Sequence, residues 1–143
     1  MTLFKKILCV CILFSLMGCR NKKIDYPDFN VKFFYLDTCQ HCQAFEENTI
    51  PLLEKEFEDA IHIEYYNMDD ESSQELYQQI TDELYFYDDE YLNDVPFFVM
   101  ENEFALLGYS AGEEEELIKD IQRALNDEAL GERLSGYRWE FEI

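Results

Sequence analysis

The sequence predicts an α/β fold in which a single mixed sheet of about four strands is flanked by helices. Three observations support this prediction. Strand-like apolar runs alternate with helix-like amphipathic segments in the order β-α-β-α-β-β-α. Aromatic residues make up 16% of the chain and apolar residues 48%, a composition typical of a packed core rather than of disorder. The length of 143 residues suits one compact domain.

The predicted elements follow one another with short connections. In chain order they are strand 31–36, helix 39–57, strand 61–67, helix 73–87, strand 97–100, strand 104–108 and helix 113–125. The first helix carries an apolar stripe at i, i+3 and i+4 spacing, which is expected to pack on the sheet. Its members are Cys42, Phe45, Thr49, Leu52, Leu53 and Phe57. Pro51 predicts a kink within this helix.

Capping and turn residues support the prediction of the later helices and strands. Ser72 and Glu75 form a predicted capping box at the start of the second helix. Residues 101–103 form the turn of an antiparallel hairpin, and residues 108–112 supply flexible backbone before the last helix. Residues 126–143 form a C-terminal extension beyond this core. Aromatic residues alternate with polar ones there, which favours a short added strand without identifying its partner.

The N-terminus is typical of a secretory signal. A basic start precedes an apolar stretch that is too short to span a bilayer. Residues 16–19, Leu-Met-Gly-Cys, resemble the lipobox of bacterial lipoproteins. This resemblance implies that residues 1–18 are a signal peptide, that Cys19 is lipidated, and that residues 19–29 tether an exported domain to the extracytoplasmic face of the cell membrane. An ordinary signal peptide or an uncleaved anchor is the alternative.

The charge balance restricts the class of partner. The chain has 32 acidic and 11 basic residues and a formal net charge of −21. A nucleic-acid partner is excluded, because so few cations cannot neutralise a phosphate backbone. The same charge repels an anionic lipid surface, so the folded domain is expected to stand off the membrane despite its anchor.

The most informative feature is a pair of cysteines, Cys39 and Cys42, separated by Gln40 and His41. The pair falls between a predicted strand and a predicted helix, so that Cys39 is expected at the helix start and Cys42 one turn inward. A helix N-terminus and a neighbouring imidazolium both stabilise the thiolate that thiol-disulfide exchange requires. A disulfide that closes so short a loop adds little stability, which favours a reactive role over a structural one. We predict that Cys39 attacks and that Cys42 resolves.

A second signal comes from Val95 and Pro96, which open an apolar strand although a proline has no ladder hydrogen bond to donate. Together with the cysteine pair, this arrangement resembles the thioredoxin superfamily over residues 30–125, and its Cys-x-His-Cys form is more similar to Dsb-type thiol oxidases. The resemblance implies a thioredoxin-like fold, a cis bond before Pro96, and a Val95 backbone that pairs with an extended substrate peptide beside the disulfide. Gln40 and Phe33 depart from the pattern, since a proline and a buried acid are usual at these positions.

The leading functional prediction is a membrane-anchored extracytoplasmic thiol-disulfide oxidoreductase that oxidises or exchanges protein thiols. It would need no cofactor and no metal, and its partners would be protein thiols or disulfides near the membrane and a membrane redox partner. His41 and the helix N-terminus favour the oxidising direction, because stabilising the thiolate makes the disulfide a stronger oxidant. An exported location, where disulfides persist, favours the same direction.

Three alternatives stay open. The first is an extracytoplasmic thiol reductase that is supplied with electrons by a membrane donor. The second is a copper- or zinc-binding lipoprotein that uses Cys39, His41 and Cys42, since thiolates and imidazole suit Cu(I) and Zn. The third is a surface interaction lipoprotein built on a redox-inert thioredoxin scaffold.

The aromatic residues of the second helix and of the segment before Pro96 allow two interpretations. They are Tyr77, Tyr85, Phe86, Tyr87 and Tyr91. They either line a peptide groove or belong to core and rim packing. His62 in the second predicted strand has no comparable context and is interpreted as an ordinary strand residue.

Overall fold

The computed structural model describes residues 24–132 and 136–141. Its centre is a mixed sheet of five strands in the order β2-β1-β3-β4-β5. The strands are β1 (Phe29–Tyr35), β2 (Ile61–Asn67), β3 (Phe97–Met100), β4 (Phe104–Leu107) and β5 (Tyr137–Glu140). β1 and β2 are parallel, whereas the other neighbouring pairs are antiparallel. The predicted α/β class with one mixed sheet is confirmed, and the predicted number of about four strands is wrong because β5 adds an edge strand.

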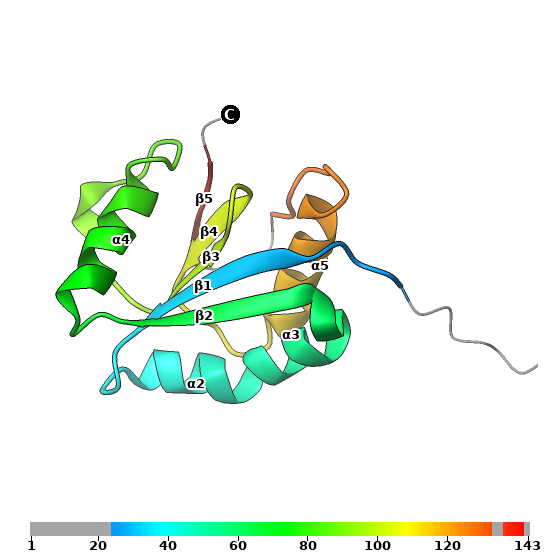
Figure 1. Ribbon diagram of the computed structural model, residues 1–143, viewed down its shortest axis with the longest axis horizontal. Helices are drawn as coiled ribbons and strands as arrows, with labels where there is room; N and C mark the ends of the chain where they lie inside the picture. Colours follow the sequence, from blue (N-terminus) through cyan, green and yellow to red (C-terminus); the bar gives the residue numbers. More distant parts are fainter. Residues whose placement is uncertain (1–23, 133–135, 142–143) are drawn as a thin grey trace, which may run out of the picture.

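Helices cover both faces of this sheet. They are α2 (Gln40–Asn48), α3 (Ile50–Phe57), α4 (Glu71–Thr81) and α5 (Glu114–Ala124). The apolar residues of α2, α3 and α5 share one core cluster, and those of α4 belong to another on the opposite face. Figure 1 shows the sheet between α4 on one side and α2 and α3 on the other. The molecule therefore has three layers with two separate cores.

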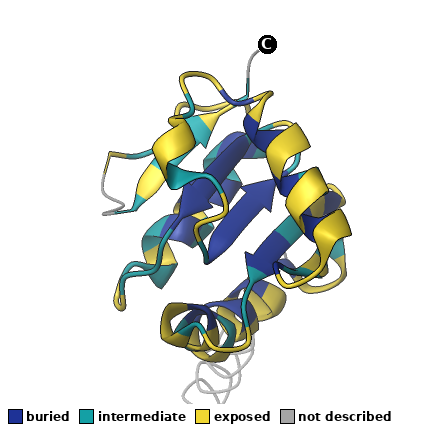
Figure 2. Cartoon of the chain, turned by 90° about the vertical axis from the view of Figure 1, so that its left-hand side faces the viewer, coloured by how far each residue is buried: buried dark blue, intermediate teal, exposed yellow. Residues whose placement is uncertain are grey.

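The strand sequences explain why there are two cores. Successive side chains of a strand point to opposite faces. On β1, Phe33 therefore enters the core beneath α2, while Phe34 enters the core beneath α4. On β3, Phe98 and Phe97 divide in the same way. Figure 2 shows these strands as buried, between helices whose outer faces are exposed.

The predicted helix 39–57 is divided at Thr49 into α2 and α3. Pro51 lies in the first turn of α3, where its missing N–H interrupts no intrahelical hydrogen bond. The kink predicted at Pro51 is thus a break between two helices. Leu52, predicted on the packed stripe, is instead 39% exposed, and α3 buries Ile50, Leu53 and Phe57.

Helix α4 begins and ends earlier than the predicted helix 73–87. Its N-cap is Asp70 rather than Ser72, and no side-chain capping hydrogen bond forms, so the predicted capping box is wrong. The helix ends at Thr81, and Leu84 instead forms an antiparallel β-bridge with Phe141. Pairing with the end of the chain thus takes the segment after Thr81 out of the helix.

The C-terminal segment is held by a buried carboxylate. Asp120 of α5 is 1% exposed. It accepts hydrogen bonds from Arg138 Nη1 of β5 at 2.6 Å, from Arg123 Nη1 at 2.7 Å and from the Gly131 backbone N–H at 2.8 Å. A single acidic side chain therefore connects α5, the following loop and β5. The alternation of aromatic residues that favoured an added strand corresponds to β5.

The predictions for the N-terminus lie outside the described residues. These predictions are the signal peptide at residues 1–18 and the lipidation of Cys19. Within the part of the chain that the structure describes, no helix has the length and apolar character needed to cross a membrane.

Candidate functional site

Cys39 and Cys42 form a disulfide at the N-terminus of α2, with their Cα atoms 5.2 Å apart. Cys39 is the N-cap residue of the helix, with extended backbone angles (φ −82°, ψ 109°). The chain reaches this position through a tight turn after β1, which is closed by a 3.0 Å hydrogen bond from the Cys39 N–H to the Leu36 carbonyl. The end of a central strand and the start of a helix therefore position the disulfide.

The two cysteines differ in exposure. Cys42 is 1% exposed and belongs to the apolar core beneath the sheet, whereas Cys39 is half-buried. The Cys42 backbone N–H donates to Cys39 Sγ at 3.1 Å, so this sulfur takes the place of a side-chain helix cap. A Cys39 thiolate here would receive the same hydrogen bond and the favourable end of the helix macrodipole.

The loop that contains Val95 and Pro96 lies against the disulfide. The Val95–Pro96 peptide bond is cis, and the Val95 carbonyl oxygen is 3.8 Å from Cys39 Sγ. The Gly108 N–H donates to the Pro96 carbonyl at 2.9 Å, which ties the loop to the end of β4. The structure thus brings two segments that are far apart in the sequence together at the sulfur of the half-buried Cys39.

Tyr77 of α4 supports this loop from the core. It is fully buried, and its hydroxyl donates to the Asp94 carbonyl at 3.0 Å and lies 3.3 Å from the Tyr87 hydroxyl. Burial and then the hydrogen bond with Tyr87 raise the pKa of Tyr77, so the side chain remains a neutral donor. Tyr77 is therefore a core residue rather than part of a groove. Sequence reasoning missed its link to the loop, which depends on long-range packing.

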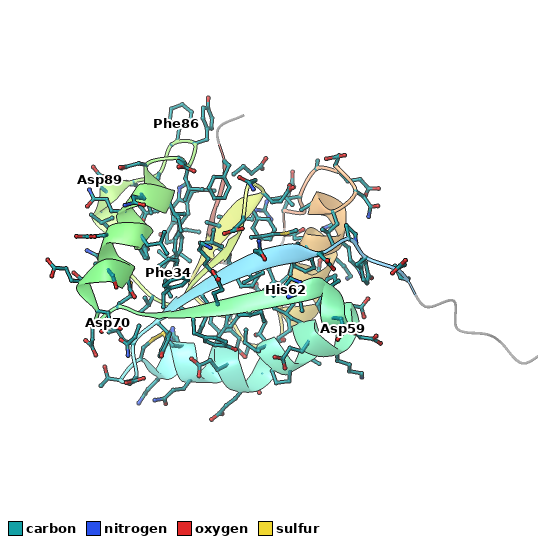
Figure 3. The ribbon with its side chains drawn as sticks, viewed as in Figure 1. Phe34, Asp59, His62, Asp70, Phe86 and Asp89 are labelled. Carbon is teal, nitrogen blue, oxygen red and sulfur yellow. A yellow bond between two sulfur atoms is a disulfide. The ribbon has the colours of Figure 1, made fainter. Side chains whose placement is uncertain are left out.

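The other aromatic residues of this segment lie nearer the surface. Phe86 and Tyr85 are 80% and 56% exposed, and Figure 3 shows Phe86 at the outer end of the loop. Tyr87 and Tyr91 pack on aromatic rings of β5, with ring centroids 4.7 and 4.4 Å apart. Packing against the edge strand therefore accounts for Tyr87 and Tyr91.

The histidines and Gln40 occupy exposed positions. Gln40 and His41 lie in the first turn of α2, and within the described residues the His41 ring forms no hydrogen bond or ion pair. His62 is paired with Asn30 near the start of β2, whereas the disulfide follows the other end of the neighbouring strand. Figure 3 shows this separation. Of the two histidines, only His41 shares the turn of the disulfide.

Two carboxylates near the cysteine pair were not singled out from the sequence. Asp37 lies in the turn before α2, and Glu46 follows Cys42 by one helical turn. Burial raises the pKa of Glu46, and the negative charges of Asp37 and Glu47 raise it further. The sequence feature that could have identified Glu46 is its i, i+4 spacing from Cys42, because residues at this spacing are neighbours on the surface of a helix.

The predicted metal alternative has no preformed site. Among the residues that the structure describes, no group of three or more His, Cys, Asp and Glu side chains is arranged to hold a metal ion. Because Cys39 and Cys42 are joined in a disulfide, they would first have to be reduced to act as thiolate ligands.

Comparison with protein-family models, with curated proteins and with solved structures finds no match for this chain. A half-buried sulfur at a helix N-terminus is bonded to a buried sulfur and lies beside a backbone carbonyl. This arrangement is compatible with thiol-disulfide exchange, in which an incoming thiolate attacks one sulfur of a disulfide and displaces the other.

Proposed function

We propose that this protein is a thiol-disulfide oxidoreductase of the thioredoxin superfamily. The observation that carries the proposal is the disulfide at the start of α2, in which the half-buried Cys39 has its Sγ 3.8 Å from the Val95 carbonyl oxygen. The order β2-β1-β3-β4, with parallel β1 and β2 and an antiparallel β3–β4 hairpin, supports a thioredoxin-like fold. The placement of the cysteine pair between β1 and α2 supports the same assignment.

In the oxidising direction, a client thiolate attacks Cys39 Sγ, and the Cys42 sulfur leaves with the electron pair of the disulfide bond. A second client thiolate then attacks the client sulfur of this mixed disulfide. The client gains a disulfide, and Cys39 leaves as a thiolate that the Cys42 N–H and the N-terminus of α2 stabilise. The protein now holds two thiols and requires an external disulfide, supplied by a membrane redox partner, to be reoxidised.

Intact mass spectrometry of the protein purified from its own cells tests this function against the alternatives. We expect the mass to rise by two hydrogen atoms on reduction, and we expect an added excess of a small disulfide to reverse the change. A retained copper or zinc ion would favour the metal-binding lipoprotein. A pair that never changes its redox state would favour the redox-inert scaffold.

We also propose that Cys19 is lipidated and anchors the domain to the extracytoplasmic face of the cell membrane. This proposal rests on the Leu-Met-Gly-Cys sequence at residues 16–19 behind a short apolar stretch. Cells fed a labelled fatty acid are expected to label the wild-type protein and to leave Cys19→Ala unlabelled. Equal label in both proteins would show that Cys19 carries no lipid.

A further inference from the structure

The resolving step requires a base that the exchange reaction itself does not supply. Cys42 is 1% exposed and shares an apolar cluster with Phe33 and Phe45. A thiol in apolar surroundings is difficult to ionise, yet only the thiolate attacks a disulfide. Phe33, which lies on the strand beneath α2, has no group that could accept a proton. A proton acceptor for Cys42 is therefore expected elsewhere than at Phe33 of β1.

Glu46 has the position that this task requires. It follows Cys42 by four residues on α2, so the two side chains are neighbours on adjacent turns, with Cβ atoms about 5–6 Å apart. Helical side chains lean toward the helix N-terminus, which directs the Glu46 carboxylate toward the turn that carries Cys42. Glu46 is half-buried, whereas its neighbour Glu47 is exposed.

The surroundings of Glu46 increase its affinity for a proton. Burial is the largest cause of its raised pKa, followed by the charges of Asp37 in the turn before α2 and of Glu47 on the same helix. On β2, burial and then the negative charges of Glu54 and Glu46 raise the pKa of Tyr65. In the described part of the chain, Glu46 takes part in no ion pair.

We propose that Glu46 accepts the proton of Cys42 when Cys42 resolves a mixed disulfide on Cys39, directly or through one water molecule. The inference rests on the proposed function. The Cys42 S–H proton passes to the Glu46 carboxylate, the Cys42 sulfur bonds to Cys39 Sγ, and the client sulfur leaves as a thiolate with the electron pair of the broken bond. In the oxidising direction the same carboxyl group returns the proton to the departing Cys42 sulfur.

The two steps can be separated with an aromatic disulfide, dithiobis-nitrobenzoate, which releases a coloured thiolate. Attack by Cys39 of the fully reduced protein releases the first thiolate, and attack by Cys42 releases the second. In Glu46→Gln, we expect the second release to slow on the order of 10²-fold near neutral pH, while the first release keeps the wild-type rate. The slow step should recover as the pH rises and the thiol ionises without help. Glu47→Gln removes the same charge from an exposed position and is the matched control.

Folding is monitored by thermal unfolding of the same variants. Because burial raises the pKa of Glu46 in the folded protein, its ionisation opposes folding once the pH exceeds that pKa. Glu46→Gln is therefore expected to unfold at neutral pH no earlier than the wild type. Glu46→Asp keeps a carboxylate on the same turn and should restore part of the rate of the second release.

The possible outcomes separate the two proposals. If the wild type releases no coloured thiolate, the proposed function fails, and the role of Glu46 fails with it. If the wild type releases both thiolates and the second release is equally fast in Glu46→Gln and Glu47→Gln, the role of Glu46 is refuted and the proposed function stands. Equal slowing of both releases in Glu46→Gln would likewise refute it, because that pattern indicates a general change of the site.

Discussion

The Cys42→Ser protein is expected to accumulate mixed disulfides with its clients until most of the protein is in covalent adducts, whereas Cys39→Ser forms almost none. The physical reason is the difference in exposure between a half-buried sulfur at the start of α2 and a sulfur that is 1% exposed. Without the Cys42 thiol, the adduct on Cys39 has no internal nucleophile to release it. Acid quenching, alkylation and nonreducing electrophoresis of cell extracts measure the adducts.

The double variant, in which Cys39 and Cys42 are both serine, is the control for adducts formed elsewhere in the chain. It should show the same background as Cys39→Ser. Adducts that form on Cys39→Ser and not on Cys42→Ser would reverse the assigned roles. Such a result would also mean that the core around Cys42 opens, because a client thiol cannot reach that sulfur in the structure described here.

Asp120→Ala is expected to lower the free energy of unfolding by about 1–3 kcal/mol, because it removes the buried acceptor of three hydrogen bonds, while the side chains of Arg138 and Arg123, 20% and 32% exposed, can still be solvated. The Asp120 carboxylate accepts hydrogen bonds from Arg138 of β5, from Arg123 and from the Gly131 N–H. Its loss should also release the edge strand. Denaturant unfolding measures the energy, and Trp139, the single tryptophan, reports on β5 by its fluorescence.

Lys119→Ala is the matched control on the same helix. Lys119 forms an exposed i, i+3 ion pair with Glu116, and such surface pairs contribute at most about 1 kcal/mol. If Asp120→Ala unfolded at the same denaturant concentration as Lys119→Ala, the carboxylate would not be holding the C-terminal segment, and the pairing of β5 with β4 and its aromatic contacts would be sufficient to hold it.

The order of the elements from β1 to α5 could be predicted from the sequence, apart from the division between α2 and α3, because each signal is local. Alternating apolar residues identify strands, and the stripe from Cys42 to Phe57 identifies the first helix. The pairing of β5 depends on contacts with distant residues, above all the ion pair between Arg138 and Asp120. The early end of α4 also involves a contact between distant residues, because Leu84 pairs with Phe141. Neither contact leaves a local pattern in the sequence.

The candidate site was predictable to a similar degree. The cysteine spacing and its position after a strand indicate a helix N-terminus, and the structure places Cys39 at the N-cap. The hydroxyl of Tyr77, which supports the loop before Pro96, and the half-buried position of Glu46 depend on packing across the sheet. The sequence shows which residues these segments contain, but their contacts depend on how the segments pack in the folded protein.

The direction of electron flow depends on opposing interactions at Cys39. A hydrogen bond from the Cys42 N–H at 3.1 Å and the N-terminus of α2 favour the thiolate, while the charge of Asp37, an exposed side chain in the turn before α2, opposes it. A hydrogen bond to a charged group contributes about 1.5–3 kcal/mol, whereas an exposed charge acting through solvent contributes about 1 kcal/mol or less. We therefore expect the direct hydrogen bond to dominate, and we predict that the disulfide is an oxidant.

Equilibration of the purified protein with glutathione buffers of known ratio, followed by alkylation and mass spectrometry, tests this account most directly. We predict a single two-electron transition, with both thiols appearing together, at a potential well above the value of about −270 mV for thioredoxin. His41→Ala should lower the potential, because an imidazolium in the same turn stabilises the Cys39 thiolate. A potential at or below about −270 mV would contradict the oxidising function, and an unchanged potential in His41→Ala would contradict the role given to the imidazole.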